Sequence, residues 1–136
     1  MKEGTHTGAS EVLRKARKLL EKPEALIYDD LAVDKHGRRV NHCEAIAVAW
    51  CPVGAIYRAA HDVYRRANGL SLDKILDDYD RQMEELKLGD DSCSVIERVT
   101  GVEMYRWEHP RGHLPPSHAE VLAVLDKAIE AAGEVL

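Results

Sequence analysis

The sequence predicts a mainly α-helical fold, a compact bundle of five or six helices with a short β-hairpin or ordered loop after the first helix. Apolar residues recur at three- and four-residue spacing in several segments, with charged residues between them, which is typical of helices with one buried face. Phe is absent and only 5% of residues are aromatic, so Leu, Val, Ile and Ala must fill the core. A chain of 136 residues fits a single domain, residues 1–136, with residues 1–9 expected to form a flexible N-terminus.

The first predicted helix begins at Ser10, a suitable N-cap, and Pro23 ends it. Residues 25–40 lose the helical spacing. Their polar turn, Asp34 to Gly37, stands between short apolar runs, as in a hairpin or an ordered loop.

The central part of the chain predicts two helices. Asn41 followed by Glu44 is a helix-start signature, and the apolar run after it predicts a buried helix over residues 45–50. A break is expected near Cys51, because Pro52 suits the first position of a new helix. That helix is expected to end at about Ala67.

Three more helices are expected in the second half. One runs from Ser71 to Gly89, its apolar face including Tyr79, Met83 and Leu86, and a short one follows from Ser94 to Gly101. Residues 102–116 are predicted to be a loop. The capping box of Ser117 and Glu120 then opens a last amphipathic helix that stops at Gly133.

Charge is unevenly distributed and limits the partners. Residues 71–91 hold eight acids and three bases, a balance of 3 − 8 = −5 that equals the net charge of the whole chain. Nucleic-acid binding is not expected, because it needs a broad basic surface. A protein partner or a small ligand is expected instead, and self-association stays open.

Cysteine usage and apolar runs point to the cytoplasm. Cys43, Cys51 and Cys93 form no C-x-x-C pair and are odd in number, which favours a reducing compartment. No signal peptide is recognised, and no apolar run approaches the ~20 residues that cross a bilayer. Nucleotide-binding and hydrolase motifs are not found, so no cofactor is predicted.

Three segments in order resemble one protein family. They are the leading helix with the turn ending in Gly37-Arg38-Arg39-Val40, the run Cys51-Pro52-Val53-Gly54-Ala55, and the segment from Trp107 into the last helix. Together these segments are similar to domain of unknown function 6197, a bacterial and actinobacteriophage family. The resemblance implies a phage-related protein but no activity. The family usually has Asn and Asp after the tryptophan, where this chain has Glu108 and His109.

Cys51 is the first candidate for chemistry. A thiol at a helix N-terminus favours the thiolate, and His61 or His109 is a candidate base for it. The competing interpretation is a small buried residue beside Gly54. A second candidate is a metal site formed by His109, His113 and His118. Their spacing matches no zinc motif, and a solvated loop is the favoured interpretation.

The loop around Trp107 and the acidic segment are candidates for binding. Trp107 either lines a pocket or seats the loop on the bundle, and the second is favoured because aromatic residues are scarce. Its charged neighbours can bind an anionic group or a partner. The candidate residues are Arg106, Trp107, Glu108 and Arg111, with Asp77 and Asp78 in the acidic segment.

The sequence thus favours a small non-catalytic binding or regulatory protein, adaptor-like in action, over an enzyme. The alternative is a thiol- or metal-dependent enzyme centred on Cys51 and the loop from His109 to His118.

Overall fold

The computed structural model describes residues 3–72 and 78–134 and confirms the mainly helical fold. Five α-helices, one 3-10 helix and two short strands lie in these residues. In chain order they are α1 (Glu3–Leu19), η1 (Pro23–Ala25), β1 (Ala32–Val33), β2 (Ala49–Trp50), α2 (Pro52–Ala67), α3 (Tyr79–Thr100), α4 (Met104–Glu108) and α5 (His118–Glu134). Asp77, one of the candidate residues, lies outside the described residues.

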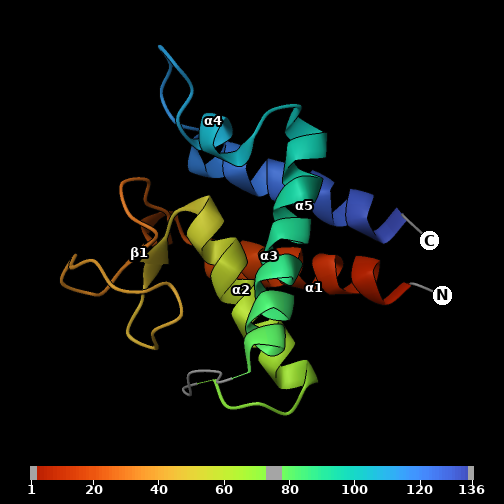
Figure 1. Ribbon diagram of the computed structural model, residues 1–136. Helices are drawn as coiled ribbons and strands as arrows, with labels where there is room; N and C mark the ends of the chain where they lie inside the picture. Colours follow the sequence, from red (N-terminus) through yellow and green to blue (C-terminus); the bar gives the residue numbers. More distant parts are fainter. Residues whose placement is uncertain (1–2, 73–77, 135–136) are drawn as a thin grey trace.

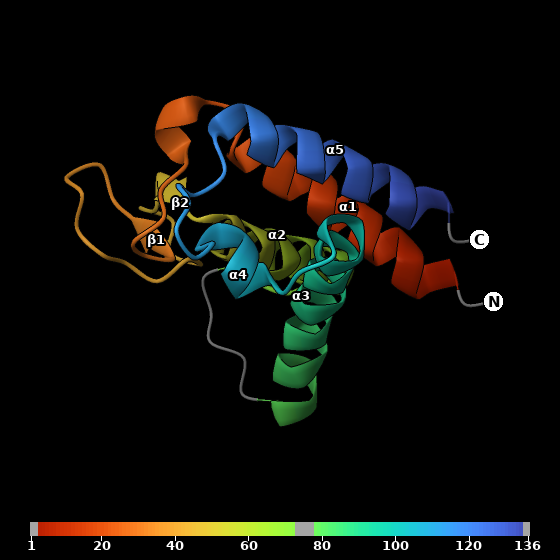
Figure 2. The ribbon, with the colours of Figure 1, turned by 90° about the horizontal axis from the view of Figure 1, so that it is seen from above.

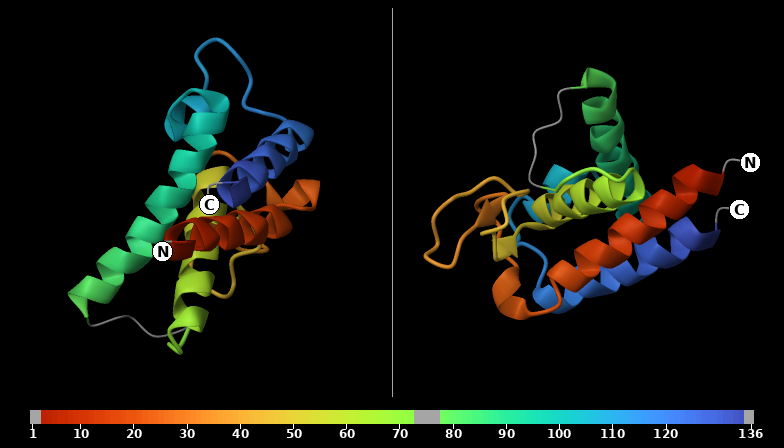
Figure 3. Two further views of the ribbon diagram at one scale, coloured as in Figure 1. Left: turned by 90° about the vertical axis from the view of Figure 1, so that its right-hand side faces the viewer. Right: turned by 90° about the horizontal axis from the view of Figure 1, so that it is seen from below.

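The long helices form two antiparallel pairs (Figures 1 and 2). α1 and α5 lie side by side with both chain termini at the same end, and the α2–α3 pair crosses them. The N-terminal half of α3 projects beyond the other helices (Figure 3). No helix in the described part of the chain combines the length and apolar character needed to span a bilayer.

The core lies where α1, α2 and α5 meet, with α3 closing one side. It consists of small and branched aliphatic side chains, as the scarcity of aromatic residues requires. The completely buried members are Val12, Leu13, Ala16, Leu20, Ala32, Ala55, Ile56, Ala59, Ala60, Ile96, Val121 and Ala128. The Ala-rich α2 therefore runs through the centre.

The prediction of a buried helix over residues 45–50 is wrong, because these residues lead into the strand β2. Asn41 and Glu44 do exchange local hydrogen bonds. The backbone N–H of Asn41 donates to Glu44 Oε2 at 2.8 Å, and the backbone N–H of Glu44 donates to the carbonyl oxygen of Asn41 at 3.0 Å, but the turn does not continue as a helix. Instead Ile46 and Val48 are exposed while Ala47 and Ala49 are buried, the two-residue alternation of a strand. β2 pairs antiparallel with β1, with Ala32 opposite Trp50.

The predicted helices 71–88 and 94–101 are a single helix in the region that begins at Tyr79. α3 begins after its N-cap Asp78 and passes through Gly89, which was expected to end a helix. Gly89 has a packing role, since a Cβ there would lie 2.4 Å from the Tyr57 ring of α2. Its missing side chain lets the two helices approach closely.

Three other boundaries differ from the predictions. α1 begins at Glu3 and so includes residues 3–9, which were expected to be flexible. Residues 104–108, predicted as part of a loop, form the short helix α4. The capping box is confirmed: the backbone N–H of Ser117 donates to Glu120 Oε1 at 2.7 Å, and the backbone N–H of Glu120 donates to Ser117 Oγ at 3.2 Å. The end of α5 differs, because the helix continues past Gly133.

Candidate functional site

Cys51 forms the N-cap of α2, the position expected from Pro52, but its thiol is not activated there. Its Sγ accepts a hydrogen bond from the backbone N–H of Gly54 at 3.3 Å, and its side chain is buried. Burial, followed by the charge of Glu108, raises the pKa of the Cys51 thiol to about 12. The helix N-terminus acts in the opposite direction but is outweighed, so the thiol keeps its proton at neutral pH.

Glu108 is a buried cap rather than an exposed binding residue. Only 4% of its surface is exposed, and its Oε2 accepts from the backbone N–H of Val53, in the first turn of α2, at 2.7 Å. Burial raises the pKa of this carboxyl group. Glu108 therefore joins the end of α4 to the start of α2 and satisfies a helix N–H that would otherwise lack a partner.

The other residues of the predicted loop site differ in exposure and in the groups they contact. Trp107 is half-buried and packs against the core, in keeping with the interpretation that it seats the loop, while Arg106 and Arg111 are exposed. His109 stands against Tyr105, with ring centroids 5.0 Å apart. His118 lies close to α1, its Nε2 2.7 Å from the carbonyl oxygen of Leu20.

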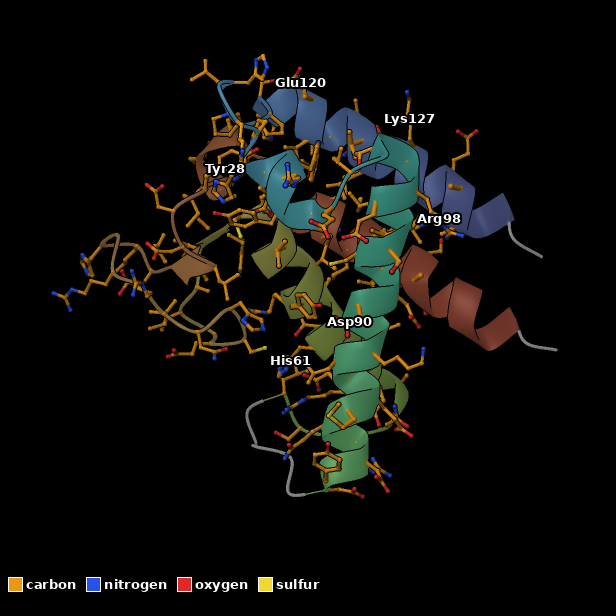
Figure 4. The ribbon with its side chains drawn as sticks, turned by 45° about the horizontal axis from the view of Figure 1, so that its top comes forward. Tyr28, His61, Asp90, Arg98, Glu120 and Lys127 are labelled. Carbon is orange, nitrogen blue, oxygen red and sulfur yellow. The ribbon has the colours of Figure 1, made fainter. Side chains whose placement is uncertain are left out.

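The three loop histidines do not form a metal-ligand group. Among the described residues, the group whose donor atoms converge is Cys43, His61 and Glu85, with one ligand atom from each lying within 4.8 Å of the others. His61 was predicted as a base for Cys51, but the structure places it with Cys43 instead. Figure 4 labels His61, which belongs to α2 and lies beside the N-terminal half of α3.

Polar contacts to the backbone hold the loop that carries Cys43. The backbone carbonyl oxygen of His42 accepts from Trp50 Nε1 at 3.3 Å and from Arg58 Nη1 at 3.2 Å. Arg58 also donates to the carbonyl oxygen of Glu44 at 2.9 Å and lies over the Trp50 ring. These contacts tie the residues on both sides of Cys43 to α2, so that its sulfur is presented to His61.

His61 is fixed at both ring nitrogens. Nε2 lies 3.0 Å from the carbonyl oxygen of Leu72, and Nδ1 lies 3.3 Å from Glu85 Oε2. Because a carbonyl oxygen only accepts hydrogen bonds, Nε2 carries a proton, and Nδ1 is left facing the carboxylate and the thiol. The other carboxylate oxygen, Glu85 Oε1, accepts from Arg65 Nε at 3.1 Å.

The cluster shifts the protonation of all three groups. Burial alone would raise the pKa of Cys43, but hydrogen bonds with His42 and His61 lower it to about 7. For His61 burial acts to lower the pKa, yet the bonds to Cys43 and Glu85 raise it to about 9. The pKa of Glu85 is lowered, because its bonds to His61 and Arg65 outweigh burial. A thiolate next to an imidazolium is thus accessible near neutral pH.

A second feature is the outer edge of α3. Tyr79, Met83 and Leu86 were predicted to face the core, but they are exposed, Tyr79 by 69%. Farther along the same edge Asp90 and Glu97 line a cavity of about 290 Å³ between α2, α3 and α4. Figure 4 labels Asp90 on α3.

The acidic segment has mixed roles in the structure. The Asp78 carboxylate accepts from the backbone N–H groups of Asp80 and Arg81 and so caps α3. Glu84 accepts a hydrogen bond from the Tyr64 hydroxyl group, and Glu85 belongs to the cluster with Cys43. No pattern in the sequence indicates that Cys43 and Glu85 meet, since 42 positions separate them and no motif links them.

The fold and the cluster define a small helical protein with a polar α2–α3 interface. The chain belongs to the family of unknown function DUF6197, whose profile matches residues 4–131 and so confirms the resemblance seen in the sequence. No curated protein and no solved structure matches the chain.

Proposed function

We propose that this protein is a non-catalytic binding protein that recognises a basic amphipathic helix of a partner protein through the outer edge of α3. The observation that carries the proposal is the uncovered apolar row of Tyr79, Met83 and Leu86 on a projecting helix. Large apolar side chains gathered on one exposed face are typical of interaction surfaces.

The spacing of the row favours a helical partner. The residues on this edge are separated by four and three positions in strict alternation, the heptad pattern that packs one helix along another. The row is Tyr79, Met83, Leu86, Asp90, Cys93 and Glu97. Its first three members are apolar and exposed, whereas the last three line the cavity.

Charge supports a basic partner. Asp90 and Glu97 line the cavity together with the apolar Val53 and Met104, and no basic side chain of the described residues lines it. Asp90 accepts a hydrogen bond from Tyr57, and Glu97 accepts from the backbone N–H of Met104 at 3.0 Å. Each carboxylate retains further acceptor capacity, so a Lys or Arg side chain of the partner fits this end of the edge.

The two interpretations of the sequence have unequal support. Thiol catalysis at Cys51 is the less supported of the two, because the raised pKa of this thiol and its capping role both favour the protonated, less nucleophilic form. Action in the cytoplasm is part of the proposal and is supported by three free cysteines.

The test uses a synthetic helical peptide with leucines at heptad positions and lysines elsewhere, labelled for fluorescence anisotropy. The key variant is Leu86→Asp and its matched control is Leu114→Asp, which adds the same charge at an 89% exposed leucine far along the chain. Nonspecific attraction to negative charge would strengthen binding in both variants. We expect Leu86→Asp to weaken binding at least about tenfold, the effect of losing roughly 1.5 kcal/mol of apolar burial, while Leu114→Asp does not weaken it.

Two outcomes contradict the proposal. One is a lack of peptide binding to the wild-type protein at low salt. The other is an equal response of the two variants, which would show that charge alone attracts the peptide. A peptide with glutamate in place of lysine is the control for partner charge and is expected not to bind.

A further inference from the structure

We propose that Cys43, His61 and Glu85 form a binding site for one divalent transition metal ion of the zinc type. This site goes beyond the proposed function, since Glu85 lies on a different face of α3 from the row that begins at Tyr79. Thiolate, imidazole and carboxylate are together the donor set that zinc takes in proteins.

The distances fit such an ion. Tetrahedral zinc with bonds of about 2.0 Å to nitrogen and about 2.1 Å to oxygen places those two ligand atoms about 3.3 Å apart. His61 Nδ1 and Glu85 Oε2 are 3.3 Å apart. One ligand atom of each of the three residues lies within 4.8 Å of the others, so the Cys43 sulfur has to approach by at most about 1.2 Å to reach the separation of roughly 3.6 Å that a shared zinc ion requires.

The surroundings of the ligands are those of a prepared metal site. Metal-bound histidines usually donate their second ring N–H to a carbonyl or carboxylate oxygen, and here Nε2 of His61 meets the carbonyl oxygen of Leu72. This contact directs the Nδ1 lone pair toward Cys43 and Glu85. Arg65 holds the other oxygen of Glu85 and also donates to the carbonyl oxygen of Ser71 at 3.0 Å, which fixes the carboxylate.

The position of His61 makes an ion physically useful. The imidazole is 96% buried, given its 4% exposure, and its Nδ1 points at a carboxylate. A neutral ring with its proton on Nε2 would place the lone pair of Nδ1 against a lone pair of Glu85 Oε2, and the two would repel each other. Nδ1 therefore needs either a proton or a cation beside it. A metal ion displaces the proton from Nδ1 and the proton of the Cys43 thiol, and it leaves a fourth position for water or a small ligand.

The test measures metal binding by the full-length chain after treatment with a chelator. Zinc is titrated in competition with a chromophoric chelator, and cobalt serves as a spectroscopic probe. We expect one ion per chain, with a thiolate-to-cobalt charge-transfer band and visible bands of tetrahedral type. Cys43→Ser should abolish the charge-transfer band, and Cys43→Ser and Glu85→Gln should each weaken zinc binding at least about tenfold.

Matched controls use the same substitutions at neighbouring or equivalent positions. Cys51→Ser keeps an oxygen N-cap on α2, and Glu84→Gln alters the residue next to Glu85, whose side chain meets Tyr64. Both controls should bind zinc like the wild-type protein. Far-ultraviolet circular dichroism of each variant shows whether its helices are intact.

A measurement on the unaltered protein does not depend on the variants. Zinc should protect Cys43 from alkylation, as mapped by mass spectrometry, and removal of zinc should restore labelling. The proposal is overturned if neither zinc nor cobalt binds stoichiometrically, if zinc leaves Cys43 labelling unchanged, or if Cys43→Ser and Glu85→Gln bind as well as the controls. Those results would make the cluster a set of hydrogen bonds and ion pairs that only joins α2 to the Cys43 loop and to α3.

Discussion

Gly54→Ala is expected to destabilise the protein strongly, although alanine is normally the better helix former. Gly54 lies in the first turn of α2, where a Cβ would stand 2.1 Å from the carbonyl oxygen of Leu31. Ordinary contact begins at 3.4 Å, so the Leu31 backbone would have to retreat by 3.4 − 2.1 = 1.3 Å. The same oxygen accepts a hydrogen bond from the backbone N–H of Cys51 at 3.3 Å, which the retreat would break.

The expected magnitude follows from three effects. Overpacking costs up to about 3 kcal/mol, and the lost hydrogen bond costs about 1 kcal/mol. Alanine returns about 1 kcal/mol through its higher helix propensity. The net loss is therefore about 3 kcal/mol in the free energy of unfolding, which lowers the melting temperature of a domain of this size by roughly 10 °C.

Urea unfolding followed by circular dichroism measures this effect, with Gly133→Ala as the control. Gly133 lies in α5 with open space around the added Cβ, so the same substitution should raise stability there by up to about 1 kcal/mol. The signs of the two changes should thus be opposite. A Gly54→Ala protein that unfolds at the wild-type urea concentration or above would refute the packing of α2 against the chain near Leu31.

The remaining predictions concern caps and pH. Glu108→Ala should cost about 1–3 kcal/mol, because the partly buried N–H of Val53 loses its acceptor, and urea unfolding measures this loss. Ser117→Ala should cost about 1 kcal/mol in the same assay by removing the cap of α5, and an unchanged midpoint would contradict the capping box. The pKa of Cys51 is raised from 9.0 to about 12, so the stability it contributes is fully present below pH 9 and is lost as pH rises toward 12. Between those values the free energy of unfolding should fall by up to about 1.4 kcal/mol per pH unit more in the wild-type protein than in Cys51→Ser.

Local signals in the sequence predicted the helices that depend on local contacts. The start of α2 at Pro52 and of α5 after Ser117 are set by capping residues a few positions away, and both predictions are confirmed. The helix over residues 45–50 was wrong because an apolar run of six residues suits a strand as well as a helix. Only pairing with β1, 16 or more positions earlier in the chain, decides between them.

The errors in α3 have the same kind of cause. A glycine normally weakens a helix, but Gly89 is retained inside α3 because the Tyr57 ring occupies the place of its side chain. The row from Tyr79 to Leu86 has the spacing of a buried face, yet the structure leaves it uncovered. Periodicity shows that a helix has an apolar edge, but not whether another element of the same chain covers it.

The candidate site was largely beyond the reach of sequence patterns. Cys43, His61 and Glu85 come from a loop and two helices, and their meeting depends on how α2 and α3 pack. His61 was identified as a candidate base, but its thiol was taken to be Cys51. Both cysteines lie within 18 positions of His61, so proximity in sequence does not distinguish them, whereas the contacts of Arg58 with the loop do.

The two helix pairs are held together by different forces, and this difference bears on where function can lie. α1 and α5 pack mainly through aliphatic side chains, with the ion pair of Arg17 and Asp126 at the surface, so this interface depends less on solution conditions. α2 and the N-terminal half of α3 are joined by hydrogen bonds and ion pairs, including Tyr64 to Glu84 and Arg65 to Glu85. Such an interface responds to protons, salt or a metal ion, because each of these alters the charges that hold it. Both proposed sites involve this half of α3, so the polar pair is the part of the molecule in which binding can change structure.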